Sequence, residues 1–567
     1  MSKPMASPAI DPFTLEIIKD SLLAAGDEMF YALQRTSKST IIYEVLDYAT
    51  GLLDATGQLI TQGNGVAGFL GTLTYSVRYT LDKFGGDGLH PGDIVVLNDP
   101  YVGGGTHLSD VSLVMPIFFE HELIAFAANK AHWTEVGGKD PGSWTTDSTE
   151  VYQEGLQFPG VKIFAEGIPN QAVLDIIEAN VRTPDMTLGD LYAGVAALRV
   201  GERRIQEIVR KYGKETVLAA VSDLLDYGER MARQELAKLP KGVYEAVDYI
   251  DDDGIGNGPF EVRVKVSISE DEFVCDFTGS AGQVPGPVNC GPTGLHAAVR
   301  AIFKGITDPQ IPANEGVFRP LKVICPPRTI FTAEKPAAVS TYWETMMYAA
   351  DLVWKALAPV VPRRLTAGHF LSVCGTVVYG QHPDDGSLFL LVEPQAGGWG
   401  AGIEKDGENG LVCVGDGETY VIPVEVCETR YGVLVDQYAF DIVDGGAGEH
   451  RGGRGLVRDY RITSEWAGVT ATFGRHKFLP WGMAGGEQGS ANFVEFIHAD
   501  GRREMFGKCA RYMLKKGEVA SLHTGTGGGF GLASKRTDEL IRDDLKNGYI
   551  TPEQAARDYH FDPGTTS

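Results

Sequence analysis

Cysteine is scarce in this chain, and its pattern excludes a disulfide framework. The 567 residues include only seven cysteines, which are scattered, odd in number and free of any C-x-x-C motif. This usage is typical of reduced thiols in a cytosolic protein. Long apolar runs are lacking too. Charged residues such as Asp11, Glu16 and Lys19 interrupt the first apolar stretch, so neither a secretion signal nor a membrane-spanning helix is predicted. We therefore expect a cytoplasmic protein.

Positive charge is in short supply as well. The chain has 50 lysines and arginines against 75 aspartates and glutamates, which gives a formal net charge of -25. Such a surface repels phosphate backbones and anionic lipids, so binding to nucleic acid or to a membrane is not expected. Two catalytic signatures are also missing. No G-x-S-x-G elbow indicates a serine hydrolase, and no Walker A motif indicates an ATP site within this chain.

The apolar pattern predicts a multidomain α+β protein, because a chain of this length exceeds a single core. Helical spacing indicates helices near 12–38, 68–84, 170–239, 342–359 and 536–560. Strand-like patterns occur at 41–62, 94–99, 111–119 and 123–131, throughout 243–335, and from 366 to about 530. The predicted units are an N-terminal mixed α/β domain (1–165), a helical segment (166–242), a mixed α/β domain (243–365), a β-rich glycine-rich domain (366–535) and a helical tail (536–567).

Glycine, in contrast, is plentiful, and it gathers in the β-rich half. Four segments there are dense in glycine: 397–402, 444–455, 482–489 and 525–531. None has the strand-turn-helix context of a dinucleotide-binding motif. Each taken singly is a loop. Together they indicate backbone packed closely against a neighbour, such as a substrate channel or a subunit interface.

Two histidines and an aspartate supply the strongest local signal. His107 and Asp110 follow a glycine turn, and His132 ends the second of two apolar strands that can pair as a hairpin. Two imidazoles and a carboxylate suit Mn, Fe or Zn and leave positions open for water or substrate. Asp99, at the end of the preceding strand, is a further candidate ligand or orients one. The alternative is that all of these are hydrogen-bonded loop residues, because H-x-x-D is a short and common pattern.

The surroundings of these residues are rich in polar side chains. The neighbours are Thr106, Ser109, Asn129, Lys130, Glu135 and Asp140. These polar neighbours favour the interpretation of His107, Asp110 and His132 as a metal site. The preceding glycines, 103–105, could cradle an anion with their N–H groups, but a tight turn that delivers His107 is the simpler interpretation.

Longer stretches extend this signal over nearly the whole chain. "NDPYVGGGTHLSDV" is followed by "AFAANKAHWTEVGGKDPGS", and later by "EGLQFPGVKI", "NVRTPDMTLGDL", "DFTGSAGQVPGPVN", "DPQIPANEGVFRP", "DGGAGEHRGGRG", "GMAGGEQG" and "GTGGGFG". In this order, from about residue 11 to 560, they resemble the hydantoinase B / 5-oxoprolinase family. That family includes N-methylhydantoinase B subunits, ATP-dependent lactamases, and the large subunits of acetone and acetophenone carboxylases.

The resemblance implies a partner and a metal. The partner is a separate hydantoinase A-like subunit that binds ATP and Mg and makes the phosphoryl transfer, in a heterotetramer of two A and two B subunits. In the acetone carboxylase relatives, a transition metal sits on two histidines and one aspartate with the spacing of His107, Asp110 and His132, so the resemblance favours Mn, Zn or Fe there. Trp133 and Thr134, together with segment 41–50, depart from the family pattern, and we expect both places to face the substrate pocket or its approach.

Two reactions fit such a site. In the first, the partner uses ATP, with bicarbonate as a possible carrier, to activate a small cyclic amide (a hydantoin, lactam or oxoproline), and this subunit opens the ring. In the second, activated bicarbonate carboxylates a ketone. We favour ring opening, with His132, Glu135 and Asp140 as catalytic candidates and Thr106 and Trp133 as substrate contacts. A non-catalytic scaffold subunit is a third alternative, although the ligand residues are all present.

Overall fold

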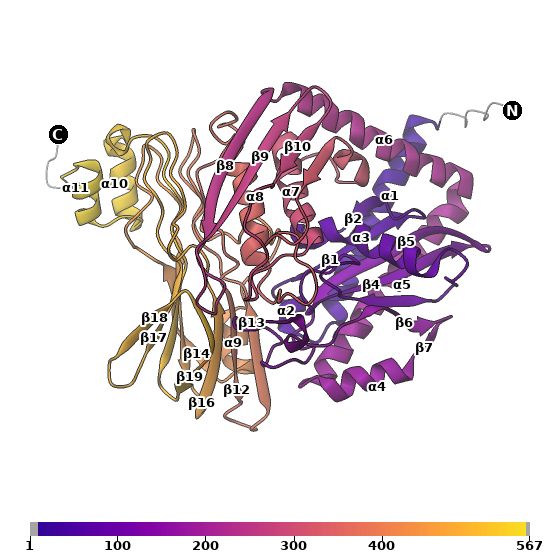
Figure 1. Ribbon diagram of the computed structural model, residues 1–567, viewed down its shortest axis with the longest axis horizontal. Coiled ribbons are helices and arrows are strands. Elements are labelled where there is room, and N and C mark those ends of the chain that lie inside the picture. Colours follow the sequence, from indigo (N-terminus) through magenta and orange to yellow (C-terminus); the bar gives the residue numbers. More distant parts are fainter. Residues whose placement is uncertain (1–9, 563–567) are drawn as a thin grey trace.

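The computed structural model describes residues 10–562 and combines helices with four separate β-sheets. The predicted mixed α and β multidomain class is confirmed. In Figure 1 the N-terminal half lies at one end of the molecule, and helices α10 (Asp538–Asn547) and α11 (Pro552–Tyr559) lie at the other. Within the described range, no helix has both the length and the apolar character needed to cross a membrane.

A seven-stranded antiparallel sheet forms the N-terminal half, in the order β2-β1-β5-β4-β3-β6-β7. Its strands are β1 (Tyr48–Asp54), β2 (Leu59–Gln62), β3 (Ile94–Leu97), β4 (Asp110–Phe119), β5 (Glu122–His132), β6 (Pro159–Ala165) and β7 (Ile168–Pro169). The first hairpin is shorter than the predicted 41–62, because Thr40–Tyr43 form a short helix, α2.

Helices cover both faces of this sheet. Helix α1 (Pro12–Thr36) starts where Asp11 accepts hydrogen bonds from two backbone N–H groups of the first turn. It packs with α5 (Pro184–Tyr212) on one face, and α3 (Ala67–Phe84) packs on the other. Successive residues of β5 therefore enter different cores: Ala127 lies under α1 and α5, whereas Phe126 and Ala128 lie under α3. Burial on both faces explains why the strand is one continuous apolar run. Helices α4 (Gln171–Asn180) and α6 (Lys214–Lys238) flank α5 in the chain.

The second sheet has the order β11-β10-β9-β8. Its strands are β8 (Gly242–Ile250), β9 (Phe260–Ile268), β10 (Phe273–Asp276) and β11 (Leu321–Ile324). The strand-like interpretation of all of 243–335 was wrong at one place, because helix α7 (Pro292–Thr307) lies within it. This helix buries Leu295, Val299 and Phe303 at a spacing of four residues. Helix α8 (Trp343–Leu357) packs against α7 and this sheet.

Two further sheets form the C-terminal half, in the orders β13-β12-β16-β19 and β14-β15-β20-β17-β18. The strands are β12 (Gly375–Gln381), β13 (Leu388–Glu393), β14 (Val433–Phe440), β15 (Leu456–Ile462), β16 (Trp466–Thr472), β17 (Phe493–Ile497), β18 (Arg503–Phe506), β19 (Lys508–Lys515) and β20 (Val519–His523). Helix α9 (Val424–Arg430) precedes β14, and short 3-10 turns occupy Val151–Gln153, Glu315–Phe318 and Ala533–Lys535.

The four glycine-dense segments pack against one another. Backbone hydrogen bonds join them, including Gly398 N–H to Gly525 O (2.9 Å) and Gly527 N–H to Gly453 O (3.0 Å). A Cβ on Gly527 would lie 2.1 Å from the carbonyl oxygen of Trp399, so only glycine fits there. The close neighbour predicted for these segments is thus their own backbone, and neither a channel nor a subunit is needed to explain the glycines.

Candidate metal centre

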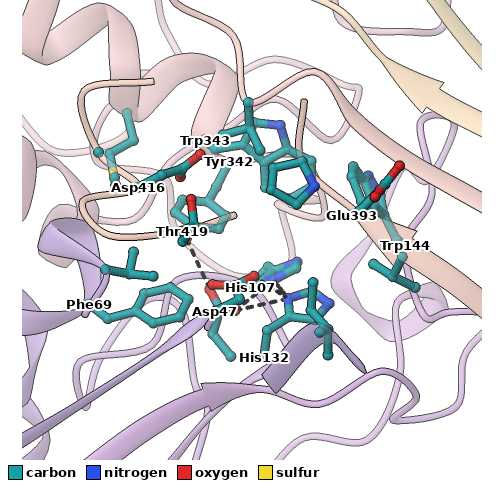
Figure 2. Close-up of a pocket in the computed structure, with 18 of the residues that line it drawn as sticks. Asp47, Phe69, His107, His132, Trp144, Tyr342, Trp343, Glu393, Asp416 and Thr419 are labelled. Atoms are coloured by element: carbon teal, nitrogen blue, oxygen red, sulfur yellow. Dashed lines mark hydrogen bonds and ion pairs between the residues drawn. The ribbon is translucent and has the colours of Figure 1, made fainter. Parts of the chain in front are cut away.

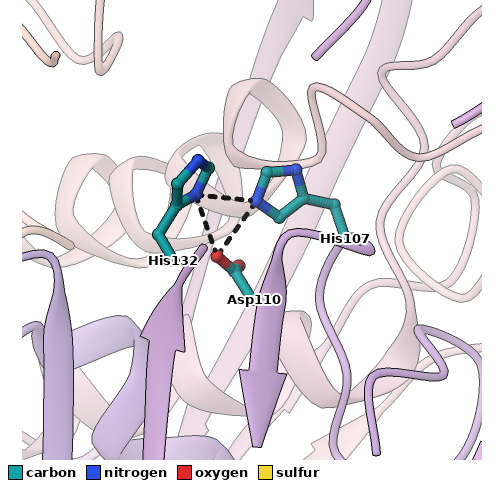
Figure 3. Close-up of side chains that lie close together, drawn as sticks. All are labelled: His107, Asp110 and His132. Atoms are coloured by element: carbon teal, nitrogen blue, oxygen red, sulfur yellow. Dashed lines mark hydrogen bonds and ion pairs between the residues drawn. The ribbon is translucent and has the colours of Figure 1, made fainter. Parts of the chain in front are cut away.

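The β4–β5 hairpin places three predicted ligands at one end of the N-terminal sheet. Asp110 opens β4, His132 closes β5, and the two residues are paired across the antiparallel ladder. His107 lies in the turn just before β4, and its side chain returns to the same end of the hairpin (Figure 3). That turn includes Gly103 and Gly104, both with positive φ, in agreement with the interpretation of these glycines as a turn.

The three side chains are buried and their ligand atoms converge. His107 Nε2 lies 3.0 Å from Asp110 Oδ1, His132 Nδ1 lies 3.2 Å from the same oxygen, and the two nitrogens are 3.2 Å apart. Atoms bound to one ion at about 2.1 Å, at angles near 90–110°, would be roughly 3.0–3.4 Å apart. The spacing therefore fits a single transition-metal ion held on one face by two imidazoles and a carboxylate.

Neighbouring groups fix the orientation of these ligands. His107 Nδ1 donates to the carbonyl oxygen of Ser340 (3.1 Å), which leaves the lone pair of Nε2 free to bind a metal. Asp110 Oδ2 accepts hydrogen bonds from Thr106 Oγ1 (2.5 Å) and from the Tyr342 hydroxyl (3.0 Å), so Oδ1 is the oxygen left for the ion. Burial alone would raise the pKa of Asp110. The charges and hydrogen bonds of the two histidines outweigh burial and hold this pKa well below its usual range.

The triad forms part of the wall of a pocket with a void of about 550 Å³, part of which is open to solvent. The pocket lies between the N-terminal half and the segments that follow it in the chain (Figure 2). Besides the triad it is lined by Ile41, Asp47, Val66, Phe69, Trp144, Tyr342, Trp343, Met346, Met347, Val373, Val392, Glu393, Pro394, Gly415, Asp416 and Thr419. Segment 41–50, which we expected at the pocket, contributes two of these residues.

Two carboxyl groups of this wall have strongly perturbed pKa values. Burial raises the pKa of Asp416 to about 7. Burial likewise raises the pKa of Asp47 to about 8, although the charge of His132, whose Nδ1 is 3.9 Å from Asp47 Oδ2, acts in the opposite direction. Glu393 is held differently, because it accepts hydrogen bonds from Ile422 N–H and from Gln395 and faces Arg458 at 3.6 Å.

The structure places Glu135 and Asp140 in a neighbouring loop, away from the pocket lining. Glu135 accepts hydrogen bonds from the N–H groups of Gly137 (2.7 Å) and Gly142 (2.9 Å), and Arg182 pairs with it at 2.9 Å. Asp140 pairs with Arg511, with both of its oxygens 2.7 Å from Nη1. Both carboxylates already have partners outside the pocket lining, and these contacts position the loop. The catalytic role of Glu135 and of Asp140 stays a prediction.

Asp99 and Trp133 also lie outside the pocket lining. Asp99 Oδ1 accepts hydrogen bonds from the N–H groups of Tyr101 (2.9 Å) and Val102 (3.2 Å), which caps the turn before the triad. Trp133, the first residue after β5, is buried with its ring in an edge contact with Phe158. Thr106 holds Asp110 in place and does not itself line the pocket.

Sequence reasoning missed the opposite wall. Trp343 and Met346 come from α8, and Asp416 and Thr419 come from a loop before α9. These residues belong to no recognisable motif. Two weak sequence features could have indicated this wall. One is a helix start rich in aromatic residues, "TYWETMMYAA", and the other is a glycine turn that carries polar side chains, "GDGET".

Known proteins match this chain along nearly its full length. The sequence profile of the family described as hydantoinase B/oxoprolinase matches residues 11–533. The B subunit of a putative D-/L-hydantoinase from Pseudomonas sp. (strain NS671) is 30% identical over 97% of this chain and 95% of its own length. The crystal structure of the ATP-dependent caprolactamase from Pseudomonas jessenii matches with a TM-score of 0.91 and 28% identity, over 98% of both chains. An acetone carboxylase structure matches with a TM-score of 0.89 at 18% identity, over 97% of this chain and 79% of that one, which shows a shared fold. This chain belongs to the hydantoinase B/oxoprolinase family.

Proposed function

We propose that this chain is the metal-binding subunit of an ATP-dependent cyclic amide hydrolase, in which it opens the ring. The observation that carries the proposal is the buried, pre-oriented triad of His107, Asp110 and His132 in the wall of a mostly apolar pocket. Membership of the family supports it, as do the similarities to a putative D-/L-hydantoinase and to an ATP-dependent caprolactamase.

The chemistry of cyclic amides explains why such a site needs help from ATP. The amide carbon is a poor electrophile because resonance with the nitrogen stabilises it. Mn, Zn or Fe bound by the triad would supply Lewis-acid polarisation of the amide oxygen. Thr106 and Tyr342 hold the Asp110 carboxylate in the orientation that leaves one oxygen free, and the apolar side chains of Phe69, Met346 and neighbours make the wall around the triad mostly apolar.

A partner protein completes the proposed enzyme. The Pseudomonas hydantoinase and caprolactamase relatives are each named as one subunit of a larger enzyme, which supports a hydantoinase A-like partner that binds ATP and Mg. We propose an assembly of two copies of each protein. Bicarbonate is proposed only as a carrier in the activation step. All seven cysteines are free thiols, which supports a reducing compartment, and we propose the cytoplasm.

One experiment tests this proposal. The chain would be purified with its A-like partner and supplied with ATP, labelled bicarbonate and a panel of hydantoins, lactams and ketones. We expect loss of ATP coupled to a ring-opened acid that carries no label. Label retained in a keto acid would instead make the protein a ketone carboxylase, and the proposal would be wrong.

A further inference from the structure

Besides His132 Nε2 of the triad, four side chains of the pocket wall carry buried polar atoms that find no hydrogen-bond partner among residues 10–562. The atoms are Trp144 Nε1, Trp343 Nε1, Thr419 Oγ1 and Asp416 Oδ2. The four residues are only 4%, 6%, 7% and 8% exposed, in that order. Each unpaired buried polar group costs about 1–3 kcal/mol. Because these groups gather around one pocket, they point to a ligand that supplies the missing partners.

The loop that carries Asp416 and Thr419 is held firmly against the N-terminal half. Gly68 N–H donates to Gly415 O (2.9 Å), and Tyr420 N–H donates to Val45 O (3.0 Å). These two bonds bracket Asp416 and Thr419. Figure 2 shows both side chains above Asp47 and His107, across the pocket from the hairpin. The polar atoms are therefore placed on the pocket by backbone contacts before any ligand arrives.

The charge of the pocket selects against anions. None of the described residues that line it is a lysine or an arginine. Glu393 is offset by Arg458, and Asp47 faces His132 at 3.9 Å, but no lysine or arginine among the lining residues faces Asp416. A ligand carboxylate at this end of the pocket would thus lie beside the buried Asp416 side chain with no lysine or arginine of the lining to offset its charge.

We propose that Asp416 and Thr419 form the polar end of a subsite for uncharged cyclic amides, and that Asp416 excludes rings that bear a carboxylate. The Asp416 carboxylate accepts a ring N–H, Thr419 bonds a second polar group of the ring, and the hydrocarbon part rests on Phe69 and Met347. This inference rests on the proposed function. It narrows the substrate class to uncharged lactams and hydantoins and sets aside 5-oxoprolinate.

A matched pair of ligands tests the selection by charge. 5-Oxoprolinamide and 5-oxoprolinate share one ring and differ in the charge of the substituent. The metal-loaded chain, purified with its partner, would be titrated with each ligand at pH 8 by calorimetry. We expect the amide to bind at least tenfold more tightly. Equal or tighter binding of 5-oxoprolinate would overturn this inference and leave the proposed function standing. If neither of these rings, nor caprolactam, nor hydantoin binds or accelerates ATP loss, the proposed function itself is wrong.

Three variants test the named residues. Asp416→Asn keeps the shape of the side chain and removes the charge, so the preference for the amide over 5-oxoprolinate should shrink by about tenfold. Thr419→Val should weaken binding of the amide by about tenfold while leaving the preference unchanged, because it removes one hydrogen bond and no charge. Glu418→Gln is the control, since it makes the same charge change on an exposed residue of the same loop, and should alter neither quantity. An unchanged preference in Asp416→Asn together with unchanged binding in Thr419→Val would overturn the assignment.

Discussion

Two buried polar regions of this protein differ in how their polar atoms are satisfied. In the loop 135–147, Glu135 bonds backbone N–H groups and Arg182, while Asp140 and Asp147 share Arg511. In the pocket wall, Asp416 and Thr419 keep polar atoms without a partner in the part of the chain that the structure describes. Both regions are rich in acids and hydroxyls. The difference shows that a polar group with all its partners serves the fold, whereas a buried polar group without partners is available to a ligand.

The largest expected effect is on the triad itself. His107→Ala or His132→Ala should remove the bound metal and lower ATP-dependent ring opening by on the order of 1000-fold, because the polarisation that the ion supplies is worth several kcal/mol. Metal content by mass spectrometry and turnover with the partner measure both effects. His121→Ala is a matched control, since His121 is exposed at the other end of the same hairpin. A variant without His107 that keeps its metal and full turnover would contradict the site.

The opposite behaviour is expected in the satisfied loop. Asp140→Asn should lower the free energy of unfolding by about 2 kcal/mol, because Arg511 loses one of its two acidic partners while remaining partly exposed. Turnover per folded molecule should stay unchanged. Urea unfolding and steady-state kinetics below the midpoint measure the two quantities, with the exposed Asp384→Asn as control. A loss of turnover in a fully folded Asp140→Asn protein would return this acid to the catalytic candidates.

Because Asp416 is buried without a cationic partner from lysine or arginine among the described residues, the free energy of unfolding should depend on pH through its carboxyl group. Burial raises its pKa to about 7 in the folded chain, against an ordinary value of 3.8. As the pH rises, the unfolded chain therefore loses this proton at a lower pH than the folded chain does. Folding is therefore penalised increasingly as the pH rises from about 4 to 7, and the penalty is constant above that. Asp416→Asn should stabilise the metal-free protein by about 2 kcal/mol more at pH 8 than at pH 5. Unfolding midpoints at the two pH values measure this. A stabilisation that does not grow with pH would mean that the carboxyl group has an ordinary pKa.

The smallest effect concerns the group that orients Asp110. Tyr342→Phe removes the hydroxyl that donates to Asp110 Oδ2 and should weaken metal affinity by about tenfold. Competition with a chelator measures the dissociation constant. Tyr348→Phe is the control, because Tyr348 lies on α8, the helix that begins directly after Tyr342, is also buried, and has a hydroxyl without a partner among the described residues. Equal metal affinity in the two variants would show that Thr106 alone suffices to hold the carboxylate.

Much of the fold could be predicted from the sequence because its signals are local. The helices that became α1, α3 and α8 and the hairpin of β4 and β5 follow from apolar spacing within one element. Helix α7 was missed because it lies between strands whose alternating pattern dominates the segment. The close packing of the glycine segments was predicted, but their neighbour was not, because that neighbour is other glycine backbone from distant parts of the chain.

The triad was accessible from the sequence because the hairpin brings its members together through local pairing. Asp110 and His132 face each other across two strands joined by a short turn, so spacing and strand register suffice to place them. Glu135, Asp140 and Asp99 lie just as close in the chain, yet their side chains turn to backbone amides or arginines. Sequence proximity does not report which way a loop side chain points.

The sequence by itself determined the ligand types, their place on one hairpin and the family of the chain, because these depend on residue chemistry and on short-range order. Only the tertiary structure decided what surrounds the ligands. Tyr342 reaches Asp110 across 232 residues of sequence, and the loop of Asp416 and Thr419 closes the pocket through two backbone bonds to the N-terminal half. Contacts of that range come from the packing of separate sheets and helices, and no local pattern encodes them.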